Sequence, residues 1–232
     1  MNKKNWIDEG KSANDVFKLL KLEKEGGAVL TSPLWSTWNS YVTMLNKKNP
    51  EESIYSVLNA QYGENNLRMM ISDVMKHART KDVAVKLQEE AWRAEGNTAD
   101  DIFKLLKLDE KGISFIESPM LSSWISYATK LGTLEEKSGE FAAIVYLESR
   151  FDNMDLARKL SLEKHRNNLA MTKGAKQLRI LQFRYWINRG VDPQMIAKRL
   201  MRENDELDIT ANVRVVIDFH EFYLANGGNR FY

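Results

Sequence analysis

The chain offers few residues whose types and spacing could carry out chemistry. Its three histidines, His77, His165 and His220, are far apart, and none falls in a spacing that would bring metal ligands together on a helix. Cysteine is absent, which excludes disulfides, cysteine nucleophiles and thiolate metal sites. The paired carboxylates Glu51-Glu52 and Glu135-Glu136 fall near expected helix starts, where interaction with the helix dipole explains them. We therefore expect neither a catalytic nor a metal site.

Sequence motifs for cofactors and membranes are equally sparse. The glycines form neither a dinucleotide loop nor a P-loop, and there is no Gly-x-Ser-x-Gly elbow. No apolar run approaches the roughly 18–20 residues that a bilayer span needs. The amino terminus lacks the apolar core of a signal peptide. The sequence predicts a protein that is not an enzyme, with no cofactor, no small-molecule substrate and no membrane span.

Charge is the strongest remaining functional signal. Residues 150–202 hold 13 Lys/Arg and 4 Asp/Glu, a local charge of +9, in a chain whose formal net charge is +2. A basic section favours an acidic partner surface or a polyanion, although solvated faces of amphipathic helices are the simpler interpretation. The candidate partner-binding residues in this section are Arg150, Arg158, Lys159, Arg179, Arg184 and Arg189.

The elements that must position these residues follow from an internal repeat. The segment Trp6–Tyr41 recurs without a gap as Trp92–Tyr127, at an offset of 86 residues. Both copies contain Lys-Leu-Leu-Lys-Leu and Ser-Pro, and in both the first Trp and the final Tyr are 35 residues apart. A third, diverged copy begins at Trp186 and reaches Tyr223. Such a repeat predicts a row of similar units that share a core.

Apolar residues at spacings of 3 and 4 indicate helices throughout. In the first copy we expect helices over Ala13–Leu22, with Leu19 on the apolar face, and over Pro33–Lys47, with Ser32 as N-cap and Leu34 facing inward. Trp35 is replaced by Leu121 in the second copy and is expected to be partly exposed. The other repeated aromatic residues are predicted to close the core, namely Trp6, Phe17, Trp38, Tyr41, Trp92, Phe103, Trp124, Tyr127 and Trp186.

Three-helix connectors are expected between the copies. In the first connector the helices are predicted at about Glu51–Gln61, Asn65–Ala78 and Lys81–Glu95, and a long helix is predicted to lead into Trp186. The third copy is predicted to carry a helix with Met195, Ile196 and Leu200 on its apolar face, and a last helix, Ile209–Ala225, with Val213, Val216, Ile217 and Phe219 inward. The expected fold is all-α, an elongated tandem array of small helical bundles.

The repeated pattern Trp…Gly…Asp-Val/Ile-Phe-Lys-Leu-Leu-Lys-Leu…Ser-Pro…Trp-x-x-Tyr resembles the WY domain of secreted oomycete RXLR effectors. Its alternation with leucine-rich connectors resembles the tandem LWY arrangement within that family. The resemblance implies a WY domain at 1–48, an LWY domain at 49–133, and a second LWY domain with a divergent WY part at 134–232.

The resemblance also implies a function. Such effectors are secreted by the pathogen, act inside the plant cell, and suppress immunity by binding host proteins without enzymatic activity. Some tandem LWY effectors capture the scaffold subunit of host protein phosphatase 2A, which is the best single expectation for the partner here. The Arg-x-Leu-Arg motif and signal peptide of the family are absent from this sequence, as expected for a mature effector region. The alternative is binding of nucleic acid, or a role in RNA silencing, through the basic section 150–202.

Overall fold

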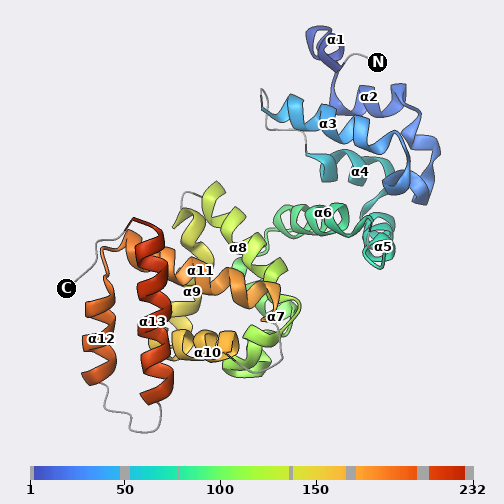
Figure 1. The fold of residues 1–232 in the computed structure, drawn as a ribbon. Helices are drawn as coiled ribbons and strands as arrows, with labels where there is room; N and C mark the ends of the chain where they lie inside the picture. Colours follow the sequence, from blue (N-terminus) through green and yellow to red (C-terminus); the bar gives the residue numbers. More distant parts are fainter. Residues whose placement is uncertain are drawn as a thin grey trace. The chain divides into compact units, whose positions relative to one another are not determined.

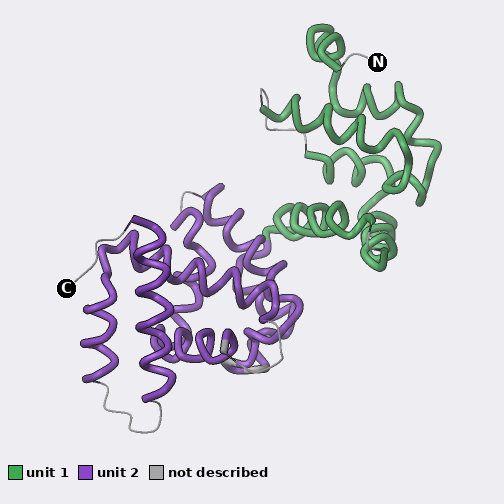
Figure 2. The backbone as a smooth tube through the Cα atoms, in the orientation of Figure 1, with its two compact units in different colours: residues 1–96 green, residues 97–232 purple. Residues whose placement is uncertain are grey.

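The computed structural model describes residues 3–47, 53–77, 79–135, 138–165, 171–202 and 209–227. Within these ranges the regular elements are α-helices and short 3₁₀ helices, and there is no β-strand (Figure 1). The predicted all-α fold is therefore confirmed. The chain divides into two compact units, Met1–Gly96 (unit 1) and Asn97–Tyr232 (unit 2), which Figure 2 shows in separate colours. The finer domain boundaries at 48/49 and 133/134 stay a prediction.

Unit 1 joins the first copy of the repeat to a three-helix connector in one core. Apolar side chains from both parts, such as Phe17, Trp38, Leu58, Leu67 and Leu87, belong to the same buried cluster. The connector helices therefore bury their apolar faces within the unit. Its elements are α1 (Lys3–Asp8), α2 (Ala13–Leu19), η1 (Leu22–Lys24), η2 (Gly26–Thr31), α3 (Trp35–Asn46), α4 (Ile54–Tyr62), α5 (Glu64–Val74) and α6 (Lys81–Ala94).

Helix α2 ends three residues earlier than the sequence predicts. Lys21 adopts a left-handed conformation with φ of 57°, which stops the helix and turns the chain so that Leu22 enters the core. Leu19, predicted on the apolar face, is instead 46% exposed because the helix buries Val16 and Phe17. The second copy repeats the turn, with φ of 55° at Lys107.

Three predictions at the start of α3 are wrong: the first residue of the helix, the burial of Leu34 and the exposure of Trp35. The helix begins at Trp35, two residues later than expected, because Ser32 and Pro33 belong to a preceding turn in which the Ser32 hydroxyl accepts from the Leu34 amide at 3.3 Å. Leu34 therefore precedes the first helical turn and is 39% exposed, not inward. Trp35, expected to be partly exposed, is buried with its ring 5.2 Å from that of Trp38.

Unit 2 contains the second copy from Asn97 onward, a longer connector and the third copy, whereas Trp92 lies at the end of unit 1. Helix α11, predicted to lead into Trp186, crosses α8 so closely that a Cβ on Gly174 would lie 2.8 Å from the Leu121 Cβ and from the Ser122 amide nitrogen. The elements are α7 (Ala99–Leu105), η3 (Asp109–Glu117), α8 (Leu121–Leu134), η4 (Gly139–Phe141), α9 (Ala142–Arg150), α10 (Asn153–His165), α11 (Lys173–Asn188), α12 (Pro193–Arg202) and α13 (Ile209–Ala225).

The inward face of the third copy matches the prediction only in part, since Ile196, Leu200 and Phe219 are buried as predicted. Met195, Val213 and Ile217 are half exposed, at 51%, 50% and 50%. Besides Phe219, helix α13 buries Ala211, Val215 and Asp218, because the Asp218 carboxylate is held by Lys164 of α10 at 2.5 Å and by Arg179 of α11 at 3.5 Å.

Phe219 is the buried aromatic residue of the last helix in this copy. Its ring contacts that of Trp186 at 5.1 Å in an edge-to-face arrangement. The Tyr223 ring lies 6.0 Å from Phe219.

Candidate partner-binding surface

The repeated aromatic side chains lie inside the two units. None of the nine residues that the sequence assigns to the core is more than 7% exposed, and five of them (Phe17, Trp38, Tyr41, Phe103 and Trp124) are fully buried. In the first copy the rings of Trp6 and Tyr41 meet edge to face at 5.6 Å. A side chain buried in this way offers almost no area to a partner.

Polar atoms on these rings tie each copy to its own amino-terminal turn. The Trp38 indole donates to the Ala13 carbonyl and the Trp124 indole donates to the Ala99 carbonyl, both at 2.8 Å. The Tyr41 hydroxyl donates to the Lys11 carbonyl and the Tyr127 hydroxyl donates to the Asn97 carbonyl, both at 2.5 Å. The two sets of bonds repeat with the same offset of 86 residues, so the aromatic positions fix identical local folds.

The carbonyls that accept these bonds flank the start of a capped helix. Ser12 and Asp15 form a capping box at α2, and Thr98 and Asp101 form one at α7. Hydrogen bonds from the Ser12 backbone and hydroxyl lower the pKa of Asp15. Those from the Thr98 hydroxyl and backbone lower the pKa of Asp101. These carboxylates are used within the fold and are not free for chemistry.

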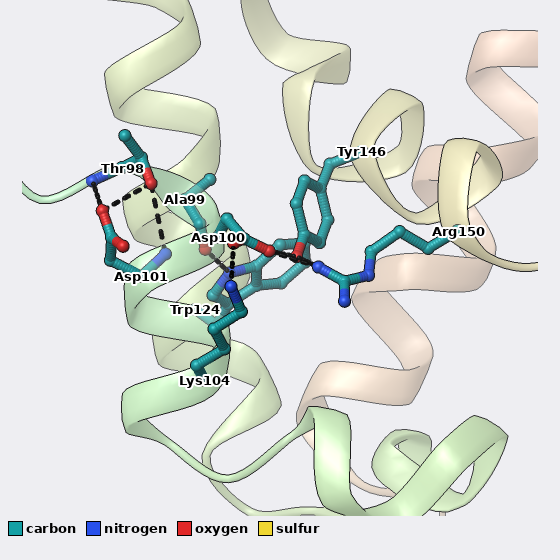
Figure 3. A network of polar contacts seen from close by, with 8 residues as sticks. All are labelled: Thr98, Ala99, Asp100, Asp101, Lys104, Trp124, Tyr146 and Arg150. Atoms are coloured by element: carbon teal, nitrogen blue, oxygen red, sulfur yellow. Dashed lines mark hydrogen bonds and ion pairs between the residues drawn. The ribbon is translucent and has the colours of Figure 1, made fainter.

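A polar network at Asp100 distinguishes the second copy from the first (Figure 3). The Asp100 carboxylate accepts from the Tyr146 hydroxyl at 2.6 Å, pairs with Lys104 at 2.6 Å, and also pairs with the Arg150 guanidinium. Hydrogen bonds from Lys104 and then Tyr146 lower the pKa of Asp100 to about 2. Burial, followed by the hydrogen bond to Asp100, raises the pKa of Tyr146. The network joins α7 to α9.

The described residues of the first copy and its connector form no equivalent of this network. Asn14 stands at the position of Asp100, and Val57 corresponds to Tyr146 when the connectors are aligned on Tyr62 and Phe151. The sequence analysis did not identify Asp100 or Tyr146 as special. Their replacement by Asn14 and Val57 in the first copy could have indicated a contact specific to the second copy.

Arg150, a predicted partner-binding residue, belongs to this network. Besides its pair with Asp100, its guanidinium lies over the rings of Tyr146 and Phe103, at 5.4 Å and 5.8 Å from their centroids. Although its side chain is 36% exposed, much of its bonding capacity serves the α7–α9 junction.

Arg158, a second predicted residue, does not lie on the surface. Its side chain is 8% exposed, donates from Nε to the Asn212 amide oxygen at 2.7 Å, and pairs with Asp155 at 2.5 Å. It connects α10 to α13 across 54 residues of sequence. Arg158 is therefore not part of an exposed basic surface. The prediction failed because the sequence pattern did not reveal that α13 covers this face of α10.

The remaining four predicted residues differ in how they are bonded. Arg179 pairs with the buried Asp218 and lies 5.6 Å over the Phe183 ring, and Arg184 pairs with Glu140 of η4 at 2.7 Å. Lys159 is half-buried on α10, whereas Arg189 is exposed at the end of α11. Arg189 makes no ion pair within the described part of the chain.

An exposed set of basic side chains therefore remains on α11 and α12 once internal pairs are set aside. Each of its side chains is exposed, and none makes an ion pair within the described residues. We call them the basic set: Lys173, Lys176, Arg189, Lys198 and Arg202. Of these only Arg189 was singled out from the sequence.

Evidence for other kinds of site is lacking in the described ranges. No three His, Asp or Glu groups come together there as metal ligands, and the His165 side chain lies outside the described residues. No helix that the structure describes combines the length and apolarity that crossing a membrane requires. An open hollow of about 500 Å³ in unit 1 is lined by Gly27, Met69, Met70 and three polar residues, Ser72, Asp73 and Lys76.

Comparison with known proteins identifies relatives of one kind. No family model matches the chain. It is 28% identical over 175 residues to the RxLR effector protein PSR2 of Phytophthora sojae, which covers 72% of this chain and 26% of that protein. It is 26% identical over 190 residues to the RxLR effector protein PSR2 of Phytophthora infestans, covering 82% and 25%.

The crystal structure of PcRxLR12 is also similar, with 28% identity, 96% of this chain and 55% of that chain covered, and a TM-score of 0.48. The chain spans about a quarter of the length of these two PSR2 relatives. The chain is thus similar over most of its length to proteins named as RxLR effectors of Phytophthora species.

Proposed function

We propose that the chain is a non-enzymatic effector region that is delivered into the plant cell and suppresses immunity by binding a host protein. Its relatives are effector proteins. The burial of all nine repeated aromatic residues supports the proposal most directly, because it commits the repeat to the fold and leaves recognition to exposed side chains outside it. Those side chains differ between the copies and so can select a partner.

The proposed partner is the scaffold subunit of host protein phosphatase 2A, and the proposed contact is the basic set on α11 and α12. The resemblance to tandem LWY effectors supports this choice of partner. Within the described residues Arg189, Lys198 and Arg202 make no ion pair, which supports the choice of surface, because a partner's carboxylates can pair with them without first breaking a described internal ion pair. Lys159 and Arg184 extend the proposed contact, while Arg150, Arg158 and Arg179 serve mainly to hold helices together.

The test is binding of the purified chain to the purified scaffold subunit by biolayer interferometry. We expect the triple variant Arg189→Glu, Lys198→Glu and Arg202→Glu to bind at least about tenfold more weakly, because charge reversal converts attraction into repulsion. The matched control, Lys18→Glu, Lys21→Glu and Lys24→Glu, changes the net charge equally on exposed residues of unit 1 and is expected to bind normally.

Circular dichroism of both triple variants should match that of the unaltered chain. Equal weakening by the two variants would show a non-specific charge effect. No binding by the unaltered chain would exclude this partner, and an affinity capture from plant extract would then be needed to find another.

Nucleic-acid binding through residues 150–202 is the second candidate, favoured by the local charge of +9. Internal pairs reduce the positive charge available to phosphates, since Arg150, Arg158, Lys164, Arg179 and Arg184 each face a carboxylate. A gel-shift titration between 50 and 200 mM salt separates the two candidates. Polyanion binding requires an affinity that falls by orders of magnitude over this range, on the order of 10³–10⁵ for 6–10 phosphate contacts.

A further inference from the structure

The last helix carries an apolar stripe on its outer face. Ile209, Val213 and Ile217 succeed one another at intervals of four residues, and they are 65%, 50% and 50% exposed. Since residues four apart lie on the same side of a helix, the three form one line, which the half-buried Leu224 continues. We call these four residues the α13 stripe.

The stripe lies opposite the face that holds α13 in the fold. Ala211, Val215, Asp218 and Phe219 are buried, and they belong to the side that packs on α10, α11 and α12 (Figure 1). A surface helix of a soluble protein normally places charged and polar side chains on its outer face. Three β-branched aliphatic side chains in that position indicate a surface that is covered by another molecule.

The charges beside the stripe carry both signs. Arg214 is half-buried and Glu221 is exposed, and their separation of seven residues places them two turns apart on the same flank of the helix. The Glu221 side chain is 67% exposed, and its pair with Lys164 is long, at 3.7 Å. A wholly acidic partner would place a negative charge opposite Glu221, and a wholly basic partner would place a positive charge opposite Arg214.

We propose that the α13 stripe is the contact between two copies of this chain, with the two α13 helices antiparallel about a twofold axis. Such a contact is self-complementary by symmetry. Placing Ile209 opposite Leu224 of the second copy brings Ile217 opposite Val216 and Val213 opposite His220, so Ile209, Ile217 and Leu224 of the stripe each meet an apolar residue across the contact. The same flank of both helices then lies on one side of the contact. Arg214 of each copy falls about 3 Å along the helix axis from the partner copy's Glu221, at 1.5 Å per residue.

The charge arrangement selects a second copy over other occupants. Two Arg–Glu pairs form symmetrically, and each uses one residue from each chain, so neither charge is left unpaired at the edge of the apolar contact. The association is independent of the proposed host partner, because it uses neither the basic set nor a partner protein.

The first test measures molar mass by light scattering over a range of chain concentrations. The unaltered chain should approach twice its mass of 26.8 kDa as concentration rises. Val213→Glu should remain at one chain mass, because it places a carboxylate in the middle of the stripe. Leu105→Glu is the matched control: Leu105 is 62% exposed elsewhere in unit 2, and its substitution should leave the association unchanged. A doubled mass that persists in Val213→Glu overturns the proposal.

The second test uses the absence of cysteine from the chain. Ile217→Cys places a thiol near the proposed twofold axis, and mild oxidation should produce a disulfide-linked pair of chains at least about tenfold faster than in Met69→Cys. Met69 is 64% exposed in unit 1 and serves as the control for random collision. Equal cross-linking rates, together with a constant mass of one chain, overturn the proposal.

The third test addresses the charges. Arg214→Glu alone and Glu221→Arg alone should each weaken the association, since each brings like charges together. The double variant restores opposite charges in the proposed antiparallel arrangement and should recover most of the lost association. Failure of the double variant to recover it excludes this arrangement.

Discussion

At the scale of single residues, the polar atoms of the repeated aromatic side chains matter alongside their rings. The indole of Trp124 and the hydroxyl of Tyr127 bond to backbone carbonyls that flank the first residues of α7. A ring alone would fill the same volume without specifying how the chain enters α7. These bonds therefore explain why Trp and Tyr occupy the two positions in both close copies.

Tyr127→Phe tests this role of the hydroxyl. We expect the free energy of unfolding to fall by about 1 kcal/mol, the typical net contribution of one intramolecular hydrogen bond. Chemical denaturation of the full chain measures the change. Tyr185→Phe is the control, since the Tyr185 hydroxyl makes no hydrogen bond within the described part of the chain. A loss of equal size in both variants would contradict the assignment.

Asp100 introduces a pH dependence that the first copy lacks. Its pKa of about 2 is below the ordinary value of 3.8, so the folded state favours the carboxylate over the protonated acid. The resulting stabilisation is fully present above about pH 4, and it disappears as pH falls through the folded-state value. Solvent screens it, because the side chain is 35% exposed.

Asp100→Asn, which installs the residue found at Asn14, should reveal this linkage. We expect the variant to be less stable than the unaltered chain at pH 5–7, and the difference to shrink towards pH 2 as the unaltered chain loses its carboxylate. Denaturation midpoints measured across this range provide the comparison. Asp109→Asn, at an exposed residue without a comparable network, should show no such trend. A difference that stays constant with pH would contradict the role of the carboxylate.

At the scale of elements, the contact between α8 and α11 depends on a missing side chain. Gly174 lets the backbone of α11 reach the first turn of α8, where the Ser122 hydroxyl also donates to the Gln177 amide oxygen at 2.8 Å. The Thr172 hydroxyl, which caps α11, also donates to the Ile116 carbonyl at 3.1 Å. The start of α11 is therefore positioned by the second copy.

Gly174→Ala should destabilise the chain in spite of the higher helix propensity of alanine. The new Cβ would meet the Leu121 Cβ and the Ser122 nitrogen at 2.8 Å, and separating the helices to relieve the overlap costs about 1–3 kcal/mol. Thermal denaturation measures the loss. Gly27→Ala is the matched control, because nothing lies within 4 Å of its Cβ position. An equal or higher midpoint for Gly174→Ala would show that the helices separate without cost.

At the scale of the whole molecule, each unit has aromatic contacts of its own. Trp124 contacts Phe103 and Tyr146 at ring distances of 5.1 Å and 5.2 Å, and all three residues lie in unit 2. Phe17 and Trp38 form the corresponding contact in unit 1 at 4.8 Å. A core substitution should therefore loosen the unit that contains it more than the other.

Hydrogen–deuterium exchange of Trp124→Ala tests this division. Removing the indole should cost about 3–5 kcal/mol, so we expect faster amide exchange in peptides from residues 97–232 and a smaller change in residues 3–47. Trp38→Ala should give the reverse pattern. Equal increases in both units for either variant would show that they open as one body.

Much of the fold could be read from the sequence because its signals are local. The all-α class follows from apolar spacings of three and four residues, and α6 and α11 lie close to the helices predicted there. The Trp and Tyr positions recur at a fixed offset, and that recurrence alone indicated a role in the core. The resemblance to RxLR effectors was also readable from these residues, and the similar proteins carry that name.

Only the tertiary structure decided which faces of those helices are covered. Leu34 and Ile217 match the apolar pattern yet are exposed, while Trp35 is buried. Arg158 looked like a surface cation but bonds to a residue 54 positions away, and Arg150 bonds to one 50 positions away. The period of a helix is set by its own backbone, so the spacing of apolar residues in the sequence is enough to predict it. Burial and charge pairing are set by whichever distant segment packs against that helix.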